Sequence, residues 1–347
     1  SPMSRGLGDV YKRQELFHIK NKFKSMDDYS LKPEIVKRIK LLEEKYEAMG
    51  QNLQSYLDGL LYADYLTYWE YVNLDVLLSL QQPKTFFPDE SIFIMYHQIT
   101  ELYFKLCLHA MKQITRDKDV SFDVFLTQFK RMNSYFGALI HSFEIMIDGM
   151  EPAQFLQFRM SLLPASGFQS AQYRMIEICA TDADNLMSLE ARNREGSIFG
   201  ELEEKYDKLY WKQGASELAT GKKTLTLKQF ERKYKDDLLE LMNEMKDDNL
   251  WNAYLRVKKN ATQDEILIAE MKQFDLNVNV NWPLMHYKSA VRYLQKDPKD
   301  IAATGGTNWQ KYLPPRYQYV IFYPELWTEE ERNNWGRKAQ RDLFAKK

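Results

Sequence analysis

Five histidines are the side chains in this sequence with the widest chemistry: His18, His97, His109, His141 and His286. Imidazole binds transition metals and transfers protons near neutral pH. A di-iron bundle would need two Glu-x-x-His pairs on facing helices, and the chain has one such pair, Glu15 with His18. A heme needs fewer protein ligands, because the porphyrin supplies four nitrogens and the protein one axial ligand. A lone histidine is more often a core or surface residue, so these residues alone leave a heme site open.

Other catalytic motifs are absent or incomplete. The stretch from Gly214 to Thr224 resembles a phosphate-binding loop, but its glycines are separated by six residues instead of four, and no buried strand precedes it. We therefore expect a solvated loop there. The sequence has no His-Glu-x-x-His zinc motif, no dinucleotide-binding glycine pattern and no Gly-x-Ser-x-Gly elbow. Cys107 and Cys179 are too few for a disulfide framework or a cysteine zinc site, and we expect two reduced thiols in the core.

The charge balance narrows the class of protein. With 48 basic and 49 acidic residues the formal charge is −1, whereas a nucleic-acid binder normally shows a basic excess. No run approaches the roughly 20 apolar residues of a membrane helix, and we recognise no secretory signal. We expect a soluble, cytoplasmic protein with no nucleic-acid or membrane partner. Residues 1–14 have no helical period, and we interpret them as a remnant outside the fold.

Apolar residues recur three and four positions apart through most of the chain, which is the helical period. The predicted helices cover Lys32–Met49, Leu53–Leu80, Glu90–Thr115, Val124–Asp148, Pro152–Leu162, Phe168–Cys179, Leu227–Met245, Asp264–Phe274 and Trp282–Leu294. We find no convincing strand alternation and no internal repeat. We therefore predict one all-α domain over residues 15–347, in which the polar residues 182–245 could be an inserted helical subdomain. Aromatic residues, 14% of the chain, would suit either a large core or a flat aromatic ligand.

Four segments carry a resemblance to a known family. They are Leu66–Asp75, Asp89–Gln98, the stretch from Phe158-Arg159 to Pro164–Ser170, and Trp282 and His286 followed by Thr304-Gly305-Gly306. In their residues and in their order they resemble the signature stretches of the tryptophan 2,3-dioxygenase family. The Pro-Ala-Ser-Gly-Phe-Gln-Ser run and the Asp-Glu run that leads to Phe-x-x-x-His-Gln are each specific. The resemblance extends from about Leu66 to Leu313.

The resemblance implies an all-α helical bundle that encloses a b-type heme, ferrous in the active state, and that forms a homotetramer. The implied reaction adds both atoms of O2 to L-tryptophan and gives N-formyl-L-kynurenine. By the same resemblance, His286 matches the axial ligand of the heme iron, and His97 matches the distal histidine that faces the indole N–H. Phe93 would pack on the indole plane. Arg159 would grip the substrate carboxylate with its planar, permanently charged guanidinium.

Further residues match family positions around the substrate. They are Thr304, Gly305 and Gly306, in a loop that closes over the amino-acid end, and Tyr68, Tyr71 and Val72, which reach a neighbouring subunit's pocket. Three departures concern the substrate contacts, and one is that the loop from His286 to Thr304 is a few residues longer than we expect, with Pro298 in the extra part. Phe155 stands where many members have a tyrosine whose hydroxyl also touches the carboxylate, and Thr307-Asn308-Trp309 replaces a usual Ser-Ser-Gly run. His109 and His141 match no role.

Two alternative functions stay open at this point. A sister heme-dependent indole monooxygenase would insert one oxygen atom instead of two, and the mass of the product separates the two reactions. A heme-binding sensor, or an inactive interaction protein, would perform no chemistry. The presence of Phe93, His97 and Arg159 together argues against that second alternative.

Overall fold

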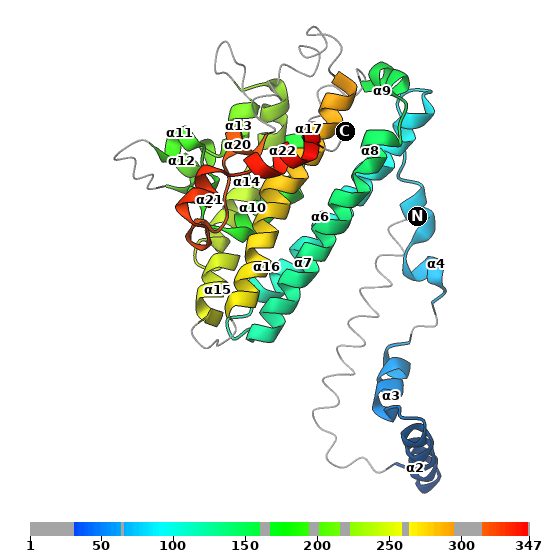
Figure 1. Ribbon diagram of the computed structural model, residues 1–347. Helices are drawn as coiled ribbons and strands as arrows, with labels where there is room; N and C mark the ends of the chain where they lie inside the picture. The colour runs from blue at the N-terminus through cyan, green and yellow to red at the C-terminus, as the bar shows by residue number, and fades with distance from the viewer. Residues whose placement is uncertain are drawn as a thin grey trace. The chain divides into compact units, whose positions relative to one another are not determined.

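The computed structural model describes residues 31–63, 66–159, 167–193, 201–215, 223–258, 264–294 and 314–345. Within these ranges the regular elements are helices (Figure 1), and an isolated β-bridge joins Met187 to Leu209. The prediction of an all-α fold is confirmed. None of the described helices is both long enough and apolar enough to cross a bilayer. Residues 1–14, interpreted above as a remnant, lie outside the described ranges.

The chain divides into two compact units, residues 1–79 and 80–347. The first contains α2 (Pro33–Ala48), α3 (Leu53–Tyr62), α4 (Tyr68–Tyr71) and α5 (Leu74–Leu78). The single helix predicted for Leu53–Leu80 was wrong, because local polar side chains interrupt it. Thr67 and Glu70 form a capping box that starts α4 afresh. Asn73 then adopts the left-handed conformation, with φ of 52°, which asparagine tolerates better than most residues.

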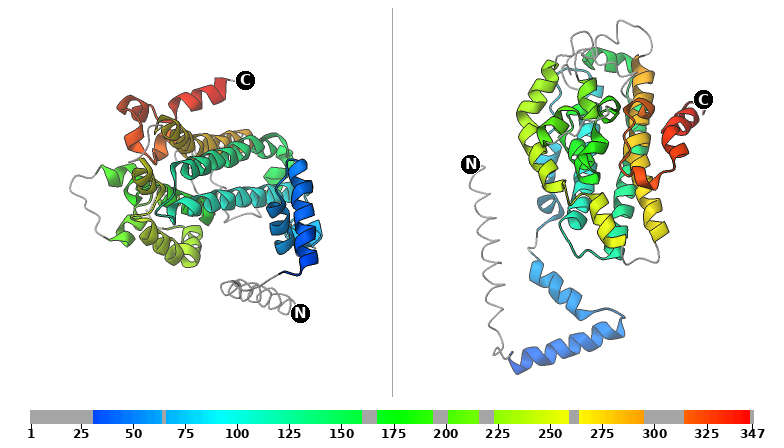
Figure 2. Two further views of the ribbon diagram at one scale, coloured as in Figure 1. Left: turned by 90° about the horizontal axis from the view of Figure 1, so that it is seen from below. Right: turned by 90° about the vertical axis from the view of Figure 1, so that its left-hand side faces the viewer.

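The second unit is built around long helices that pack lengthwise. The principal ones are α6 (Pro88–Thr115), α7 (Phe122–Ser142), α10 (Ala171–Ala180), α14 (Leu225–Met245), α16 (Asp264–Leu276) and α17 (Trp282–Leu294). Figures 1 and 2 show α6 and α7 side by side, and α16 packs along α7 while α10 packs between α6 and α14. Their facing sides are apolar, and fully buried residues include Met111, Phe129 and Phe274. Burial of these faces is the main source of the fold's stability.

Shorter helices complete the second unit. They are α8 (Glu144–Asp148), α9 (Pro152–Phe158), α11 (Leu189–Arg192), α12 (Leu202–Asp207), α13 (Tyr210–Gly214), α15 (Leu250–Lys258), α20 (Pro315–Gln318), α21 (Glu329–Asn333) and α22 (Arg337–Ala345). Helices α12 and α14 pack together, and α14 also packs on α10. An inserted subdomain over residues 182–245 stays a prediction.

The beginning of α6 shows why a helix boundary is difficult to predict. Asp89 had the features of an N-cap, but Pro88 already occupies the first turn. The Asp89 carboxylate instead accepts the N–H of Glu151 at 2.6 Å, which ties α6 to the start of α9. Glu90 accepts the N–H groups of Lys84 and Thr85. Both acidic side chains are therefore used to fix the loop connections around α6.

A wide turn joins α16 to α17 where two separate helices were predicted. Residues Asn277–Asn281 form a π-helical segment, η5, and the N–H of Trp282 reaches back five residues to the carbonyl of Asn277. The cause lies in Pro283, which has no N–H and whose ring would clash with the carbonyl of Asn279 in a regular helix. The extra residue in the π turn makes room for that ring. The turn also sets the direction in which α17 leaves the core.

Candidate active site

His286 lies in the second turn of α17, directly after the π turn. Its side chain is half-buried, and its ring packs edge-on against Trp282 and Phe143, with centroids 4.5 and 4.6 Å away. Nδ1 lies 3.2 Å from the carbonyl oxygen of Trp282. Because a carbonyl can only accept, Nδ1 carries the proton and Nε2 keeps its lone pair. Burial lowers the pKa of His286 to about 4, so the imidazole is neutral at pH 7, the state that binds a metal.

His97 repeats this arrangement on a different helix. It lies on α6, and its Nδ1 is 2.7 Å from the carbonyl oxygen of Phe93, so Nδ1 donates and Nε2 is left as an acceptor. The side chain is exposed, while the Phe93 ring lies tilted against it with centroids 4.1 Å apart and Tyr96 meets it edge-on at 6.2 Å. Desolvation by these neighbours lowers the pKa of His97. The ring therefore offers a neutral hydrogen-bond acceptor near neutral pH.

An aromatic path connects the two histidines. The ring of Tyr96 on α6 packs against Phe143 at 5.6 Å, and Phe143 packs in turn against His286. The charge of His97, when protonated, lowers the pKa of His286, which places the two imidazoles within electrostatic reach of one another. Two helices far apart in the sequence, α6 and α17, thus bring two neutral imidazoles together among aromatic rings.

Helix α9 brings further predicted residues to the same end of α6. Phe158 and Phe155 contact Phe93 with ring centroids 5.9 and 6.4 Å apart, and Phe155 also packs on Tyr293 of α17 at 4.6 Å. Arg159 follows Phe158 at the C-cap of α9 and is 8% exposed. A buried guanidinium pairs with anionic or polar groups. Its position beside the Phe93 cluster suits a role at the substrate's charged end.

The donor set around His286 fits a heme. Within the described residues, no cluster of three or more His, Cys, Asp or Glu side chains could hold a metal ion alone. A porphyrin would need from this site only one neutral imidazole and an apolar, aromatic surrounding. His286 supplies the free Nε2. The hydrogen bond from its Nδ1 to the Trp282 carbonyl fixes the orientation of the ring, as such hydrogen bonds do for metal-bound histidines. His97, Phe93 and Phe143 supply the surrounding surface.

The remaining predicted site residues belong to the first unit or lie outside the described residues. Tyr68, Tyr71 and Val72 belong to the first unit, where their side chains are 71%, 75% and 37% exposed. Thr304, Gly305 and Gly306, together with the altered run after them, lie outside the described residues. Their roles stay predictions.

Two supporting residues were missed by the sequence reasoning. Asp275, fully buried at the end of α16, accepts hydrogen bonds from the backbone N–H groups of Phe322 and Tyr323 and from the Trp327 indole. Tyr173 donates its hydroxyl to the carbonyl of Val278 in the π turn at 2.8 Å. The only sequence signal for Asp275 was a charged residue inside an apolar run, and its partners come more than 40 residues later.

Comparison with known proteins identifies the family of this chain. Residues 58–267, more than half of the chain, match the family model described as tryptophan 2,3-dioxygenase. A tryptophan 2,3-dioxygenase from Bacillus thuringiensis subsp. konkukian is 29% identical over 279 residues, which cover 76% of this chain and 91% of that protein. The protein of the same name from Polaromonas sp. is 27% identical and covers 76% and 86%. One from Bacillus anthracis is 41% identical over 116 residues, 32% of this chain and 40% of that protein. The chain belongs to the tryptophan 2,3-dioxygenase family.

Proposed function

We propose that this chain is a heme-dependent dioxygenase of tryptophan catabolism that converts L-tryptophan and O2 into N-formyl-L-kynurenine. The observation that carries the proposal is the pair of neutral imidazoles, His286 and His97, on two different helices. Each has its proton fixed on Nδ1 and its Nε2 free. A histidine with only a packing role does not need a free Nε2. A metal ligand and a hydrogen-bond acceptor for the substrate both require one.

In this proposal His286 holds a b-type heme through Nε2. The heme, when bound, supplies the oxygen activation and the redox chemistry that no amino-acid side chain provides. The protein supplies binding, orientation and exclusion of water. Phe143 and Trp282 keep the His286 ring in one orientation, so that the cofactor would be presented to the Phe93 and His97 side of the cluster.

His97 and Phe93 would position the indole. The Nε2 lone pair of His97 accepts the indole N–H, and the Phe93 ring lies 4.1 Å from the imidazole on the same helix face. Arg159 would bind the carboxylate through two parallel N–H groups, which fixes the register of the amino-acid end and hence of the ring. Thr304, Gly305 and Gly306 would close over that end, and Phe155 would contribute an apolar wall.

We further propose a cytoplasmic homotetramer in which Tyr68, Tyr71 and Val72 complete a neighbouring subunit's pocket. The cysteines support a reducing compartment, since Cys107 and Cys179 are buried and free. The exposed aromatic side chains of α4 support a partner surface.

Turnover with isotopically labelled oxygen tests the proposal. Heme-loaded, reduced protein is mixed with L-tryptophan and ¹⁸O2, and the product is followed by absorbance and by mass spectrometry. We expect N-formyl-L-kynurenine with two labelled oxygens. A product with one labelled oxygen would assign the chain to the indole monooxygenases, and heme binding without any product would favour a sensor.

A further inference from the structure

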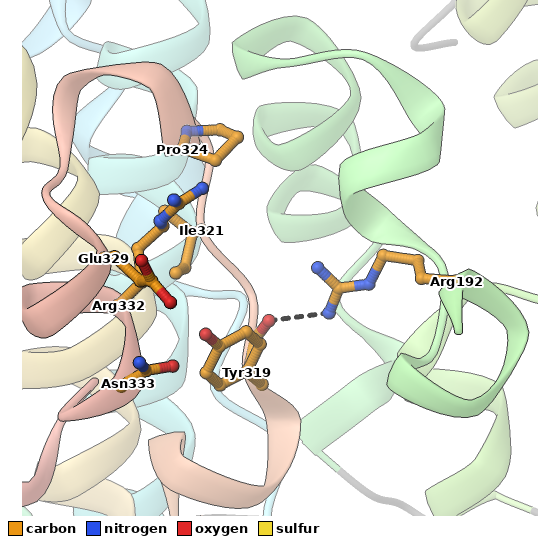
Figure 3. Close-up of a pocket in the computed structure, with 7 residues that line it drawn as sticks. All are labelled: Arg192, Tyr319, Ile321, Pro324, Glu329, Arg332 and Asn333. Carbon is orange, nitrogen blue, oxygen red and sulfur yellow. Dashed lines mark hydrogen bonds between the residues drawn. The ribbon is translucent and has the colours of Figure 1, made fainter.

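A cavity of about 250 Å³ lies at another place in the second unit. It opens between Arg192, at the end of α11, and a wall made by Tyr319, Ile321 and Pro324 with the residues of α21 (Figure 3). Neither His97 nor His286 lines it. The cavity is therefore separate from the candidate active site.

Arg192 is a cation that is only partly paired. Its side chain is half-buried, and Nη2 donates to the backbone carbonyl of Tyr319 at 2.7 Å. Among the described residues, none accepts a hydrogen bond from the buried Nε–H. Burial lowers the pKa of Arg192, and among the described residues no carboxylate offsets that effect. A buried donor without a protein acceptor is often satisfied by a bound water or ion. For the positively charged guanidinium, that ion would be an anion.

A second guanidinium lines the opposite side of the same cavity. Arg332 projects from α21, so that the two arginines come from segments about 140 residues apart in sequence. The carboxylate of Glu329 is also present, but this side chain is exposed, where solvent screens its charge. In the described part of the chain no ion pair joins Glu329 to either arginine. The half-buried cations therefore dominate the field inside the cavity.

The rest of the cavity wall is apolar, and the backbone of Tyr319 in that wall has a strained conformation. Ile321 is buried and Pro324 half-buried, and both present carbon to the cavity. Tyr319 has φ of 49°, a left-handed conformation that is a genuine outlier for a bulky side chain. This conformation turns its carbonyl to Arg192. Strained backbone of this kind clusters at ligand sites, where the surrounding structure maintains it.

We propose that this cavity binds a small organic carboxylate. The carboxylate lies between Arg192 and Arg332, whose planar guanidinium groups match its two oxygens. The carbon part of the ligand lies against Ile321 and Pro324. Inorganic phosphate is also an anion, but it has no carbon part to contact the apolar wall. We therefore assign the cavity to an organic carboxylate.

Calorimetric titration of the heme-loaded full chain tests the proposal, with sodium propionate as the probe and sodium chloride at equal ionic strength as the reference. We expect saturable binding of one propionate per chain. Arg332→Gln should weaken it about tenfold or more, as loss of a charge-assisted pair requires, and so should Arg192→Gln. Because Arg192 also holds the Tyr319 carbonyl, its variant could fold poorly, and Arg332→Gln keeps the test decisive.

Matched controls locate the binding. Arg337→Gln removes an exposed guanidinium on the neighbouring α22 and should leave propionate binding unchanged. Arg159→Gln should also leave it unchanged, which separates this cavity from the proposed tryptophan site. Absence of saturable binding, or equal binding in Arg332→Gln, would overturn the proposal. Tighter binding of phosphate than of propionate would overturn the assignment to carboxylates. Since neither tryptophan nor O2 is present, the outcome is independent of the dioxygenase activity.

Discussion

His286 and His97 differ in what surrounds Nε2, and this difference separates their proposed roles. His286 is half-buried on α17 between two aromatic rings, whereas His97 is exposed and packs against the tilted ring of Phe93. A metal ligand benefits from a fixed, desolvated position, and a substrate acceptor must be reachable. The resemblance assigned the two roles, and local hydrogen bonds supply a physical reason why each residue suits its role.

We expect His286→Ala to lose tight heme binding, because the variant lacks the Nε2 proposed to hold the iron, and the second neutral imidazole, His97, lies on a different helix. The Soret absorbance of the purified protein measures this. His141→Ala, which removes an exposed histidine from the end of α7, should retain the heme and serves as the control. Full activity and an unchanged Soret band in His286→Ala would show that another residue holds the iron.

The pKa of His97 leads to a pH prediction. Because desolvation lowers that pKa below its ordinary value of 6.5, kcat/KM should be flat at neutral pH and fall only on the acid side, where Nε2 becomes protonated and no longer accepts the indole N–H. The unfolded chain takes up this proton at higher pH than the folded chain, so the same protonation also reduces stability as pH falls. His97→Asn, which keeps an acceptor but does not titrate, should lose this acid limb. An identical limb in both proteins would assign it to another group.

Arg159 and Phe155 together predict how the substrate carboxylate is held. A charge-assisted, two-pronged contact contributes about 1.5–3 kcal/mol, so Arg159→Ala should raise KM for tryptophan about tenfold to a hundredfold. Phe155→Tyr restores one neutral hydrogen bond and should bind tryptophan equally well or up to about tenfold better. Tryptamine, which lacks the carboxylate, should be a poor substrate. Efficient turnover of tryptamine by the parent enzyme would contradict this assignment.

At the level of elements, the long helices could be predicted and their junctions could not. The apolar periodicity of α6, α7 and α14 is local information, and their predicted ranges differ from the observed ones by only a few residues or by a single short break. The π turn depends on a clash between Pro283 and a carbonyl four residues earlier, which periodicity does not detect. Most Asp275 contacts reach residues 322–327, and a charged residue inside an apolar run does not reveal such distant partners.

Asp275 joins the C-terminal segment to the end of α16, next to the π turn that precedes α17. Its carboxylate takes N–H groups from Phe322, Tyr323, Trp327 and Asn279. Asp275→Asn replaces one accepting oxygen by an amide nitrogen that faces these donors, and we expect a loss of about 1–3 kcal/mol in the free energy of unfolding. Urea denaturation at pH 7 measures the loss. Glu270→Gln, on the same helix but partly exposed, is the control.

The pH dependence of this effect follows from the pKa of Asp275, which burial raises from 3.8 to about 6. Between these values the folded chain holds a proton that the unfolded chain has released, so the parent's stability should decrease as pH rises from about 4 to about 6. Asp275→Asn lacks this dependence. The difference in stability between parent and variant should therefore narrow over that range, and a difference that widens would contradict the buried, proton-holding carboxylate.

On the scale of the whole molecule, the described residues of the first unit form no core of their own. None of the described residues of α2, α3, α4 and α5 is buried, and Tyr68 and Tyr71 are 71% and 75% exposed. Large apolar side chains left open in this way normally mark an interaction surface. The sequence resemblance places these tyrosines in a neighbouring subunit's pocket. The alternative is ordinary packing within one chain.

Complementation between inactive variants distinguishes a shared pocket from an internal one. The double variant Tyr68→Ala/Tyr71→Ala should keep its helical content but lose activity, because it has no tyrosines to complete the pocket of a neighbouring subunit. Arg159→Ala should also lose activity, because its own pocket lacks the residue that binds the carboxylate. In mixed oligomers formed by co-expression, a subunit of the tyrosine variant still has Arg159 in its pocket. A neighbouring Arg159→Ala subunit can supply the two tyrosines to that pocket. A fraction of the sites is then complete, and activity should exceed that of either variant alone. Light scattering should give a tetramer for the parent. An active monomer, or mixed oligomers no more active than the separate variants, would show that α4 serves the pocket of its own chain.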